Sequence, residues 1–201
     1  MTRGPELRSG LARLRPMEAR DAERIWEAVQ DSEGLRLTGT TQQFTRQQID
    51  EWAATISDQP GRYDWAITPG QYRDGKPISD DLIGEICLNS IDEYKRSANL
   101  RLQLLKEYRG RGYGGEAILA VLKFAFEGYR DHDGEYEPGP RLHRVSLDVL
   151  ALNPRALQLY ESLGFTQEGR LRDAHYIDGA WVDVILMSML VDEYHDRHGN
   201  R

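Results

Sequence analysis

A glycine-rich turn in the middle of the chain constrains the fold more than any other feature of the sequence. The turn, Arg109 to Gly115, follows a strand-like run from Ala98 to Leu105 and opens a strongly apolar helix. Glycines let a backbone approach a ligand closely, and the free N–H groups at a helix start favour an anion. We therefore expect a pyrophosphate cradle here, with Arg109 and Arg111 adding positive charge beside it. The plainer interpretation is a tight turn flanked by solvated arginines.

The same glycines match the dinucleotide-binding fingerprint, Gly-x-Gly-x-x-Gly, at Gly110, Gly112 and Gly115. That fold needs a parallel strand soon after the helix, ending in an acidic residue that binds the ribose. Here a polar stretch, Glu127 to Arg141, follows the helix, and too little chain remains for a doubly wound sheet. A nucleoside-triphosphatase loop needs Gly-Lys followed by Ser or Thr, which the residues around Gly115 do not supply. Neither nucleotide-binding fold is therefore expected.

Hydrophobic periodicity and turn signals predict the elements before the turn. They are an edge strand over Leu11–Arg15, before Pro16, a helix over Asp21–Gln30, a helix capped by Thr45, and strands over Arg62–Thr68, Asp81–Leu88 and Ala98–Leu105. Thr45 and Gln48 form a capping-box pattern that precedes an apolar helical face. The polar segment between the two helices, Gly34–Phe44, is expected to be a loop.

The elements after the turn helix follow from caps and turns. They are a strand over Val145–Val149, a helix with Asn153 as N-cap, Pro154 at its first position and Gly164 at its end, and a hairpin of Phe165–Asp173 with Trp181–Met189 around Asp178-Gly179. The stretch Glu127–Arg141 is expected to be an exposed insertion of unassigned role. The order βααβββαβαββ predicts a mixed α/β fold in a single domain over residues 1–201, with a core over about 11–191 and a polar tail over 192–201.

Composition and charge exclude several classes of protein. The chain has 201 residues, 26 Lys and Arg against 33 Asp and Glu, and a net charge of −7, which argues against a nucleic-acid partner. No apolar stretch approaches the roughly 18 residues of a membrane-spanning helix. Cys87 is the only cysteine, which excludes an internal disulfide, a zinc finger and an iron–sulfur site. We expect a cytoplasmic protein without a metal.

The glycine turn also resembles a family signature. Arg109-Gly110-Arg111-Gly112-Tyr113-Gly114 is similar to the Arg/Gln-x-x-Gly-x-Gly/Ala signature of the GNAT superfamily of N-acetyltransferases. The resemblance extends through Leu14–Pro16, Ile83–Ile86, Leu142–Val145, Asn153, Ala156 and Leu159–Phe165. Glu168–Asp173, Tyr176–Gly179 and Val182-Asp183 are similar to the branch that acetylates ribosomal-protein N-termini. Several ordered motifs at the right separations are more specific than any one of them.

This resemblance implies the GNAT fold, a central, mostly antiparallel twisted sheet that splays at the acetyl-CoA site and is flanked by helices. The strand Ala98–Leu105 sits where the pantetheine arm would enter that opening. The implied acetyl-CoA-binding residues are Leu102, Leu104, Arg109, Gly110, Arg111, Gly112, Tyr113, Gly114, Gly115 and Asn153. Backbone groups near Leu102 and Leu104 would hold the pantetheine and thioester, and the turn amides would bind the pyrophosphate. Asn153 would bond to the pantetheine arm, which is compatible with a helix cap.

Catalytic roles follow from the same resemblance. A lysine-like amine has a pKa of about 10.4, so it must lose a proton before it attacks a thioester, and the departing thiolate gains a proton. Tyr160 looks like the family's general acid for the thiolate, although a tyrosine there could also simply pack against Ala156 and Leu163.

The general base has several candidates. The related branch commonly has a glutamate where this chain has Asn99, and an amide cannot accept a proton. Glu85, on the neighbouring strand, is our preferred base. Asp148 and His143 are the alternative side chains, although Glu85, Asp148 and His143 could each equally be a solvated strand residue. Ordered water is the remaining alternative.

The implied function is transfer of an acetyl group from acetyl-CoA to a primary amine by direct attack in a ternary complex. The acceptor, a protein N-terminus or a small-molecule amine, is left open, because the first two helices, their loop and the last hairpin would select it. The alternative is a non-catalytic acyl-CoA-binding module that senses or regulates, and the presence of Tyr160 favours the enzyme. Family analogy alone suggests a homodimer.

Overall fold

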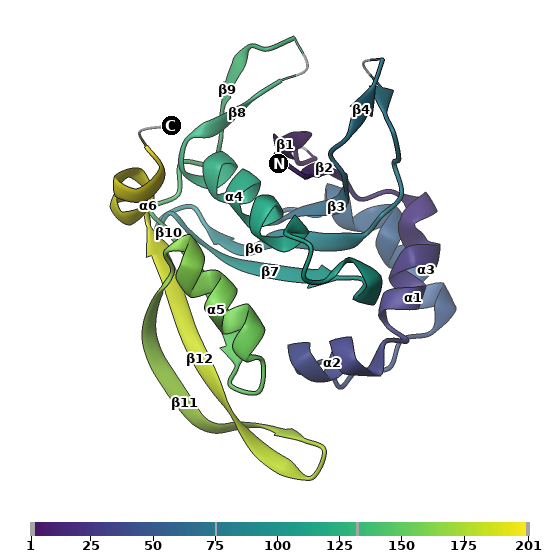
Figure 1. Cartoon of the computed structure of the whole chain (residues 1–201), viewed down its shortest axis with the longest axis vertical. Coiled ribbons are helices and arrows are strands. Elements are labelled where there is room, and N and C mark those ends of the chain that lie inside the picture. Colours follow the sequence, from purple (N-terminus) through teal and green to yellow (C-terminus); the bar gives the residue numbers. More distant parts are fainter. Residues whose placement is uncertain (1–2, 75, 132, 200–201) are drawn as a thin grey trace.

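The computed structural model describes residues 3–74, 76–131 and 133–199. Within these residues, eight strands form one sheet in the order β1-β2-β3-β6-β7-β10-β12-β11 (Figure 1). Their bounds are β1 Leu7–Ser9, β2 Ala12–Pro16, β3 Tyr63–Pro69, β6 Gly84–Asp92, β7 Ser97–Leu104, β10 Arg144–Leu150, β11 Thr166–Ile177 and β12 Ala180–Leu190. Every adjacent pair is antiparallel except β7 and β10. The mixed α/β fold with a mostly antiparallel sheet is thus confirmed.

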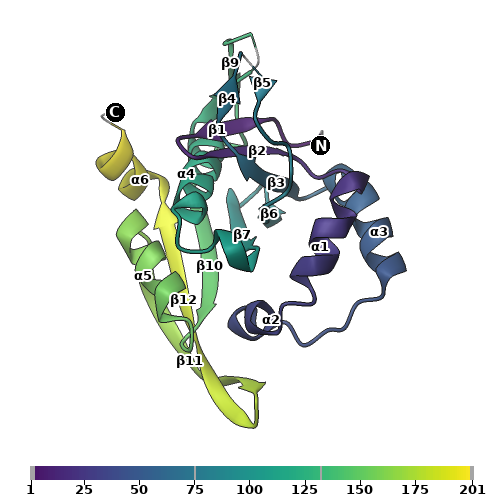
Figure 2. The same cartoon turned by 45° about the vertical axis from the view of Figure 1, so that its right-hand side comes forward.

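Helices cover both faces of the sheet (Figures 1 and 2). Their bounds are α1 Ala22–Ala28, α2 Ser32–Thr38, α3 Arg46–Thr55, α4 Tyr113–Phe126, α5 Pro154–Leu163 and α6 Val191–His198, with short 3-10 turns at Ala19–Asp21, Ile56–Asp58 and Lys106–Tyr108. Helices α4 and α5 pack with one buried cluster, and α1 and α3 pack with another. In the described part of the chain, none of these helices combines the length and the apolarity that a membrane-spanning helix needs.

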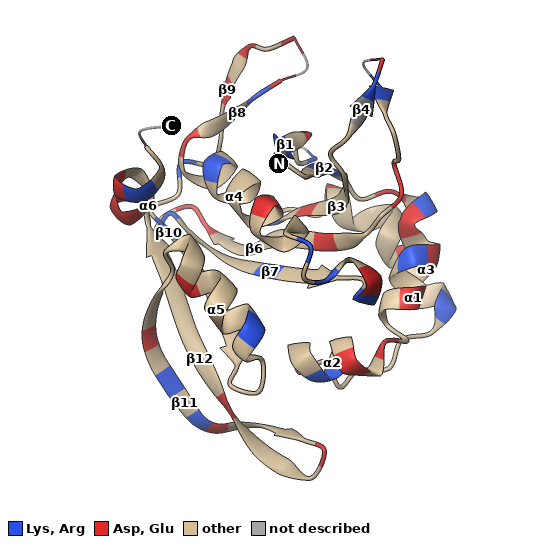
Figure 3. Cartoon of the chain, viewed as in Figure 1, with Lys and Arg blue, Asp and Glu red and all other residues tan. Residues whose placement is uncertain are grey.

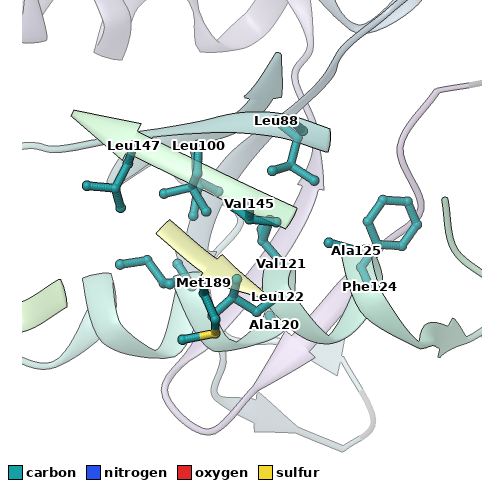
Figure 4. Close-up of a cluster of buried hydrophobic side chains, with 14 of the residues drawn as sticks. Leu88, Leu100, Ala120, Val121, Leu122, Phe124, Ala125, Val145, Leu147 and Met189 are labelled. Carbon is teal, nitrogen blue, oxygen red and sulfur yellow. The ribbon is translucent and has the colours of Figure 1, made fainter. Parts of the chain in front are cut away.

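Helix α4 lies at the centre of the larger cluster. Apolar residues occur almost all round it, and Ile118, Val121, Leu122 and Ala125 are each fully buried. A helix with so little polar surface is stable only when it is enclosed. Figure 4 shows its side chains meeting those of strands β6, β7, β10 and β12, so α4 joins the two halves of the sheet.

Alternation along β6 divides its side chains between the two faces. Ile86 and Leu88 are buried in the α4 cluster, which places Glu85 and Cys87 on the opposite face. On that face Ala66, the β3 residue opposite Glu85, belongs to the buried cluster formed by α1 and α3. Glu85 therefore lies beside an apolar helical layer.

The sheet opens between β7 and β10. In the described chain these strands pair at only three positions, Arg144 with Ser97, Val145 with Ala98 and Ser146 with Asn99. β7 then continues to Leu104 and β10 to Leu150 without pairing further. Figure 1 shows the two strands diverging below α4. The splay expected from the family resemblance is present at the expected strand.

Two expectations for the N-terminal part are wrong. The segment Gly34–Phe44, expected as a loop, contains most of α2, whose seven residues are too few for helical periodicity to stand out. Strand β2 is not at the edge of the sheet, because β1 pairs outside it with Leu7 opposite Leu14. With three residues, β1 is too short to give an alternating pattern.

The stretches expected as an insertion and a polar tail contain regular structure. β8 (Gly128–Arg130) pairs with β9 (Tyr136–Pro138), and a similar short hairpin, β4 (Tyr72–Arg73) with β5 (Lys76–Pro77), precedes β6. Most of the expected tail forms α6, whose Tyr194 is 5% exposed and packs on Phe126 with ring centroids 5.1 Å apart. Leu7 is also buried, so packing extends beyond both ends of the expected core range.

We expect Tyr194→Ala to lower the free energy of unfolding by about 3 kcal/mol, because it removes a buried ring and leaves a cavity against Phe126. Urea unfolding at equilibrium measures this loss. The control, Tyr176→Ala, removes a ring that is 58% exposed, and its effect should stay within about 0.5 kcal/mol. Equal, small effects of the two variants would show that α6 does not share in the cooperative core.

Candidate functional site

The glycine turn has the backbone conformation of an open helix start. Gly110 has φ of 75° and Gly112 has φ of 90°, both in the left-handed region that favours glycine. Gly112 is the N-cap of α4, and its carbonyl accepts the first helical bond from the Glu116 N–H at 3.2 Å. The N–H groups before Glu116 have no partner within the helix. They converge at the positive end of a 14-residue helix, which can hold an anion.

Small residues bring this turn against the diverging end of β7. A Cβ atom at Gly114 would lie 3.2 Å from Leu102 Cδ2 and 3.5 Å from Leu104 Cδ1. At Gly115 it would lie 3.5 Å from Leu159 Cδ1 on α5. The side chains of Leu102 and Leu104 thus pack under α4. Their backbone lies in the part of β7 that no longer pairs with β10.

The two arginines of the turn have different surroundings. The guanidinium of Arg111 lies over the Tyr108 ring, 5.9 Å from its centroid. The guanidinium of Arg109 turns away from the helix start: Nε donates to the Leu104 carbonyl at 3.0 Å, and Nη2 bonds to the Asp31 carboxylate. The positive charge expected beside the turn from Arg109 is therefore neutralised by a residue 78 positions earlier in the chain.

Arg155, which the sequence analysis did not single out, supplies another cation at the turn. Its guanidinium lies against Gly110, where a Cβ atom would collide with Nη2. Arg155 is in the first turn of α5, next to Pro154. A cation at a helix N-terminus opposes the helix dipole unless an anion is near. That unfavourable position was the sequence signal that could have identified it.

Both polar atoms of the Asn153 side chain have a hydrogen-bond partner. Its Oδ1 accepts the Ala156 N–H at 3.1 Å, so the predicted N-cap of α5 is confirmed. Its Nδ2 donates to the Leu37 carbonyl of α2 at 3.4 Å. The residue thus connects the start of α5 with α2 at the mouth of the opening.

Tyr160 points into the packed side of α5. It is 8% exposed, and its ring packs on Phe165 with centroids 5.8 Å apart. Burial raises the pKa of Tyr160 to about 12, and the Asp148 carboxylate acts in the same direction. The hydroxyl is therefore protonated at neutral pH and can donate a proton or a hydrogen bond.

Glu85 lies on β6 opposite Gln103 of β7. Burial raises the pKa of Glu85 to about 7, and the nearby Asp64 carboxylate adds to the shift, while Arg101 and Arg62 oppose it. Arg62 is held on Asp64 by bonds of 2.6 and 2.7 Å, so its charge is already paired. A carboxyl group with such a pKa exchanges protons at neutral pH, as a general base must.

Gln103 is a second polar residue that the sequence analysis did not single out. It lies between Leu102 and Leu104, so alternation turns its side chain to the Glu85 face. Among the described residues, its buried Nε2 has no hydrogen-bond partner. A buried unpaired amide costs about 1–3 kcal/mol, which favours a ligand or water as its partner. Gln103 continues the alternation of polar residues and leucines along β7, so no signal in the sequence set it apart.

The other base candidates lie in different places. Asp148 is exposed on the diverging part of β10 and is close enough to Tyr160 to affect its pKa. His143 precedes the paired segment of β7 and β10, and its backbone N–H donates to the Arg96 carbonyl at 2.6 Å. It therefore lies at the closed end of the splay, away from the glycine turn. Asn99 pairs with Ser146 where the opening begins.

Comparisons with known proteins agree with this geometry. The model of the acetyltransferase (GNAT) domain family matches residues 12–166. The spermidine N(1)-acetyltransferase of Vibrio cholerae is 32% identical over 117 residues, which are 58% of this chain and 61% of that protein. YdaF of Bacillus subtilis, named provisionally as a ribosomal N-acetyltransferase, is 27% identical over 90% of this chain and 92% of its own length.

The fold is also found in a solved structure. The crystal structure of spermidine N-acetyltransferase from Vibrio cholerae in complex with CoA and spermine superposes with a TM-score of 0.74. The match covers 92% of this chain and 98% of the other, at 24% sequence identity. At 24% identity, this likeness supports the fold alone. The family model matches more than half of the sequence, and that match identifies the family. The chain belongs to the GNAT family of acetyltransferases.

Proposed function

We propose that this protein transfers the acetyl group of acetyl-CoA to a primary amine by direct attack in a ternary complex. The observation that carries the proposal is the position of the glycine turn: the start of α4, where free N–H groups converge, adjoins the end of β7 that does not pair with β10, at the opening of the sheet. A long ligand with an anionic centre and a narrow arm fits this combination. Acetyl-CoA has both parts.

The cradle would hold the ligand through main-chain groups. The amides of Gly110 to Gly115 would bind the pyrophosphate, with Arg111 and Arg155 adding positive charge. The pantetheine arm would lie along β7 near Leu102 and Leu104 like an added strand, and Asn153 would contribute from the opposite side of the opening. Most of this binding is independent of side-chain charge, which agrees with Arg109 being engaged elsewhere.

Proton transfers complete the reaction. The amine nitrogen attacks the thioester carbonyl carbon, the carbon–sulfur bond breaks, and an amide forms. Glu85, directly or through water, would take the proton that the amine loses, since its pKa is raised to about 7. Tyr160 would give a proton to the departing thiolate, and the high pKa of its buried hydroxyl keeps that proton in place beforehand.

An amine panel tests the proposal against a non-catalytic acyl-CoA-binding module. Purified protein is incubated with acetyl-CoA and, separately, with spermidine, lysine and peptides that begin with alanine or serine, and free thiol is followed. We expect amine-dependent thiol release with at least one acceptor and an acetylated product by mass spectrometry. The matched control omits the amine, which separates transfer from hydrolysis. CoA binding by calorimetry without transfer to any acceptor would favour the module.

We expect Glu85→Gln to lower kcat/KM by roughly 10²–10⁴ at pH 7.5 or so, because the amide cannot accept a proton. For the wild type, kcat/KM should fall as pH drops below about 7, where Glu85 becomes protonated. This acid limb should be absent from the variant. The pH profile with one good acceptor measures both effects, and an acid limb that persists in Glu85→Gln would assign the base role to another group.

Stability gives an independent readout of Glu85. Its pKa in the fold lies above the ordinary value, so the contribution of its protonated form to stability is complete below the unfolded pKa and is lost as pH rises through about 7. Glu85→Gln keeps the neutral form at every pH. The excess of its urea midpoint over that of the wild type should therefore grow between about pH 4.5 and pH 7 and stay constant above pH 7, whatever the variant does to catalysis.

A further inference from the structure

Helix α2 lies across the mouth of the opening, apart from α1 and α3 (Figures 1 and 2). Three contacts tie it to the half of the sheet that contains β10. Asn153 Nδ2 donates to the Leu37 carbonyl at 3.4 Å, and Arg36 Nε bonds to the Asp178 carboxylate at 2.5 Å. Next to the helix, a Cβ atom at Gly39 would lie 3.2 Å from the His175 ring. α2 therefore borders the space through which an acceptor would approach.

Ion pairs with the segment after β7 tie α2 to the other half, and Figure 3 shows acidic and basic positions on both elements. At the surface, Lys106 Nζ lies 3.9 Å from the Glu33 carboxylate, and the more buried link is made by Arg109. Arg109 joins the Leu104 carbonyl at the end of β7 to the Asp31 carboxylate, which immediately precedes α2. Both side chains are mostly buried, at 18% exposure for Arg109 and 16% for Asp31. Burial by itself would raise the pKa of Asp31, but the Gly34 amide and the Arg109 guanidinium outweigh it and lower that pKa. The pair is thus charged at neutral pH.

The first turn of α2 is shaped around this guanidinium. A Cβ atom at Gly34 would lie 2.7 Å from Arg109 Nη2 and 2.7 Å from Asp31 Oδ2. Glycine inside a helix costs about 1 kcal/mol relative to alanine, so its presence there needs a reason. Close packing of Arg109 on the helix supplies one. A seven-residue helix is also too short to persist alone, so its position depends on such ties.

We propose that Arg109 is a positioning residue that connects the acetyl-CoA turn to α2 and so sets the acceptor side of the site. The inference rests on the proposed acetyl transfer. It assigns the first residue of the family signature to the acceptor rather than to the phosphates. Loss of the pair would free α2 and weaken acceptor binding, while the turn amides would still hold CoA.

The test compares Arg109→Gln, Asp31→Asn and the double variant. Hydrogen exchange of the α2 amides, residues 32–38, should become about tenfold faster in each single variant. The double variant should be no worse than the single ones, because all three remove the same pair. The KM of an acceptor found in the amine panel should rise about tenfold, with kcat and the Kd for CoA changed less than about twofold.

Arg46→Gln is the matched control, since it removes an exposed arginine that pairs with Glu23 and Asp50 on the helical layer. It should leave the exchange of α2 and both binding constants unchanged. If Arg109→Gln fails to fold, Asp31→Asn, which keeps the size of the side chain, carries the test. The CoA titration and the exchange data need no turnover, so they report on the proposal even if no amine is acetylated.

A loss of CoA affinity in Arg109→Gln with unchanged α2 exchange would overturn the proposal and make Arg109 a phosphate ligand. Unchanged exchange in both single variants would also overturn it, as would additive effects in the double variant.

Discussion

Tyr160→Phe should lower kcat by roughly 10²–10⁴ while the Kd for acetyl-CoA stays unchanged. The substitution deletes only the hydroxyl, and the ring that packs on Phe165 remains. Without the proton donor, the thiolate must leave unprotonated or take its proton from water. Single-turnover kinetics with saturating acceptor measure the chemical step directly.

Tyr194→Phe is the matched control, because it removes a hydroxyl from another buried tyrosine, outside the opening. Its kcat should equal that of the wild type. If Tyr160→Phe also retains wild-type kcat where chemistry limits the rate, Tyr160 is a packing residue and water supplies the proton. An alanine variant would confuse the result, since removal of the ring would open a cavity in the core.

Gly112→Val should reduce CoA affinity by about 100-fold or more. A residue with φ of 90° is strained when it carries a branched side chain, at about 1–3 kcal/mol, and relief of that strain would rotate the turn amides away from the phosphates. The new Cβ atom would also lie 3.2 Å from Leu11 Cδ1, on the chain segment between β1 and β2. Calorimetric titration with CoA measures the loss.

Gly61→Val provides a control matched for strain. Gly61 has φ of 76°, and apart from its two neighbours in the chain no described residue has an atom within 4 Å of the position its Cβ would take. This variant should lose a similar amount of stability and keep the CoA affinity of the wild type. Equal CoA affinities of the two folded variants would contradict the cradle.

The sequence predicted most of the fold because its long elements carry strong local signals. The apolar run of α4, the Asn153 cap and the Asp178-Gly179 turn all act over a few residues, and each predicted element appears in the structure. The short elements β1 and α2 escaped because three or seven residues hold too little of a repeating pattern. Their positions are set by contacts with distant parts of the chain.

The candidate site divides in the same way. The glycine turn, Tyr160 and Glu85 could be named from motifs, and the structure brings the turn to the opening of the sheet. The partner of Arg109 could not be named, because Asp31 is far away in sequence and an ion pair leaves no local pattern. Gln103 became visible only when the register placed it opposite Glu85 and left its amide unpaired.

The divergence of β7 and β10 also bears on aggregation. A strand edge with free N–H and C=O groups is a template for pairing with other chains, and proteins usually protect such edges with charges, prolines or bulges. Here the unpaired length of β7, beyond Asn99, faces inward toward β10, and α2 lies across its open end. A broad extended strand from another molecule would be blocked by these walls. The shape of the fold thus protects this strand edge from pairing with another chain. The same shape keeps the edge accessible to a narrow, flexible ligand.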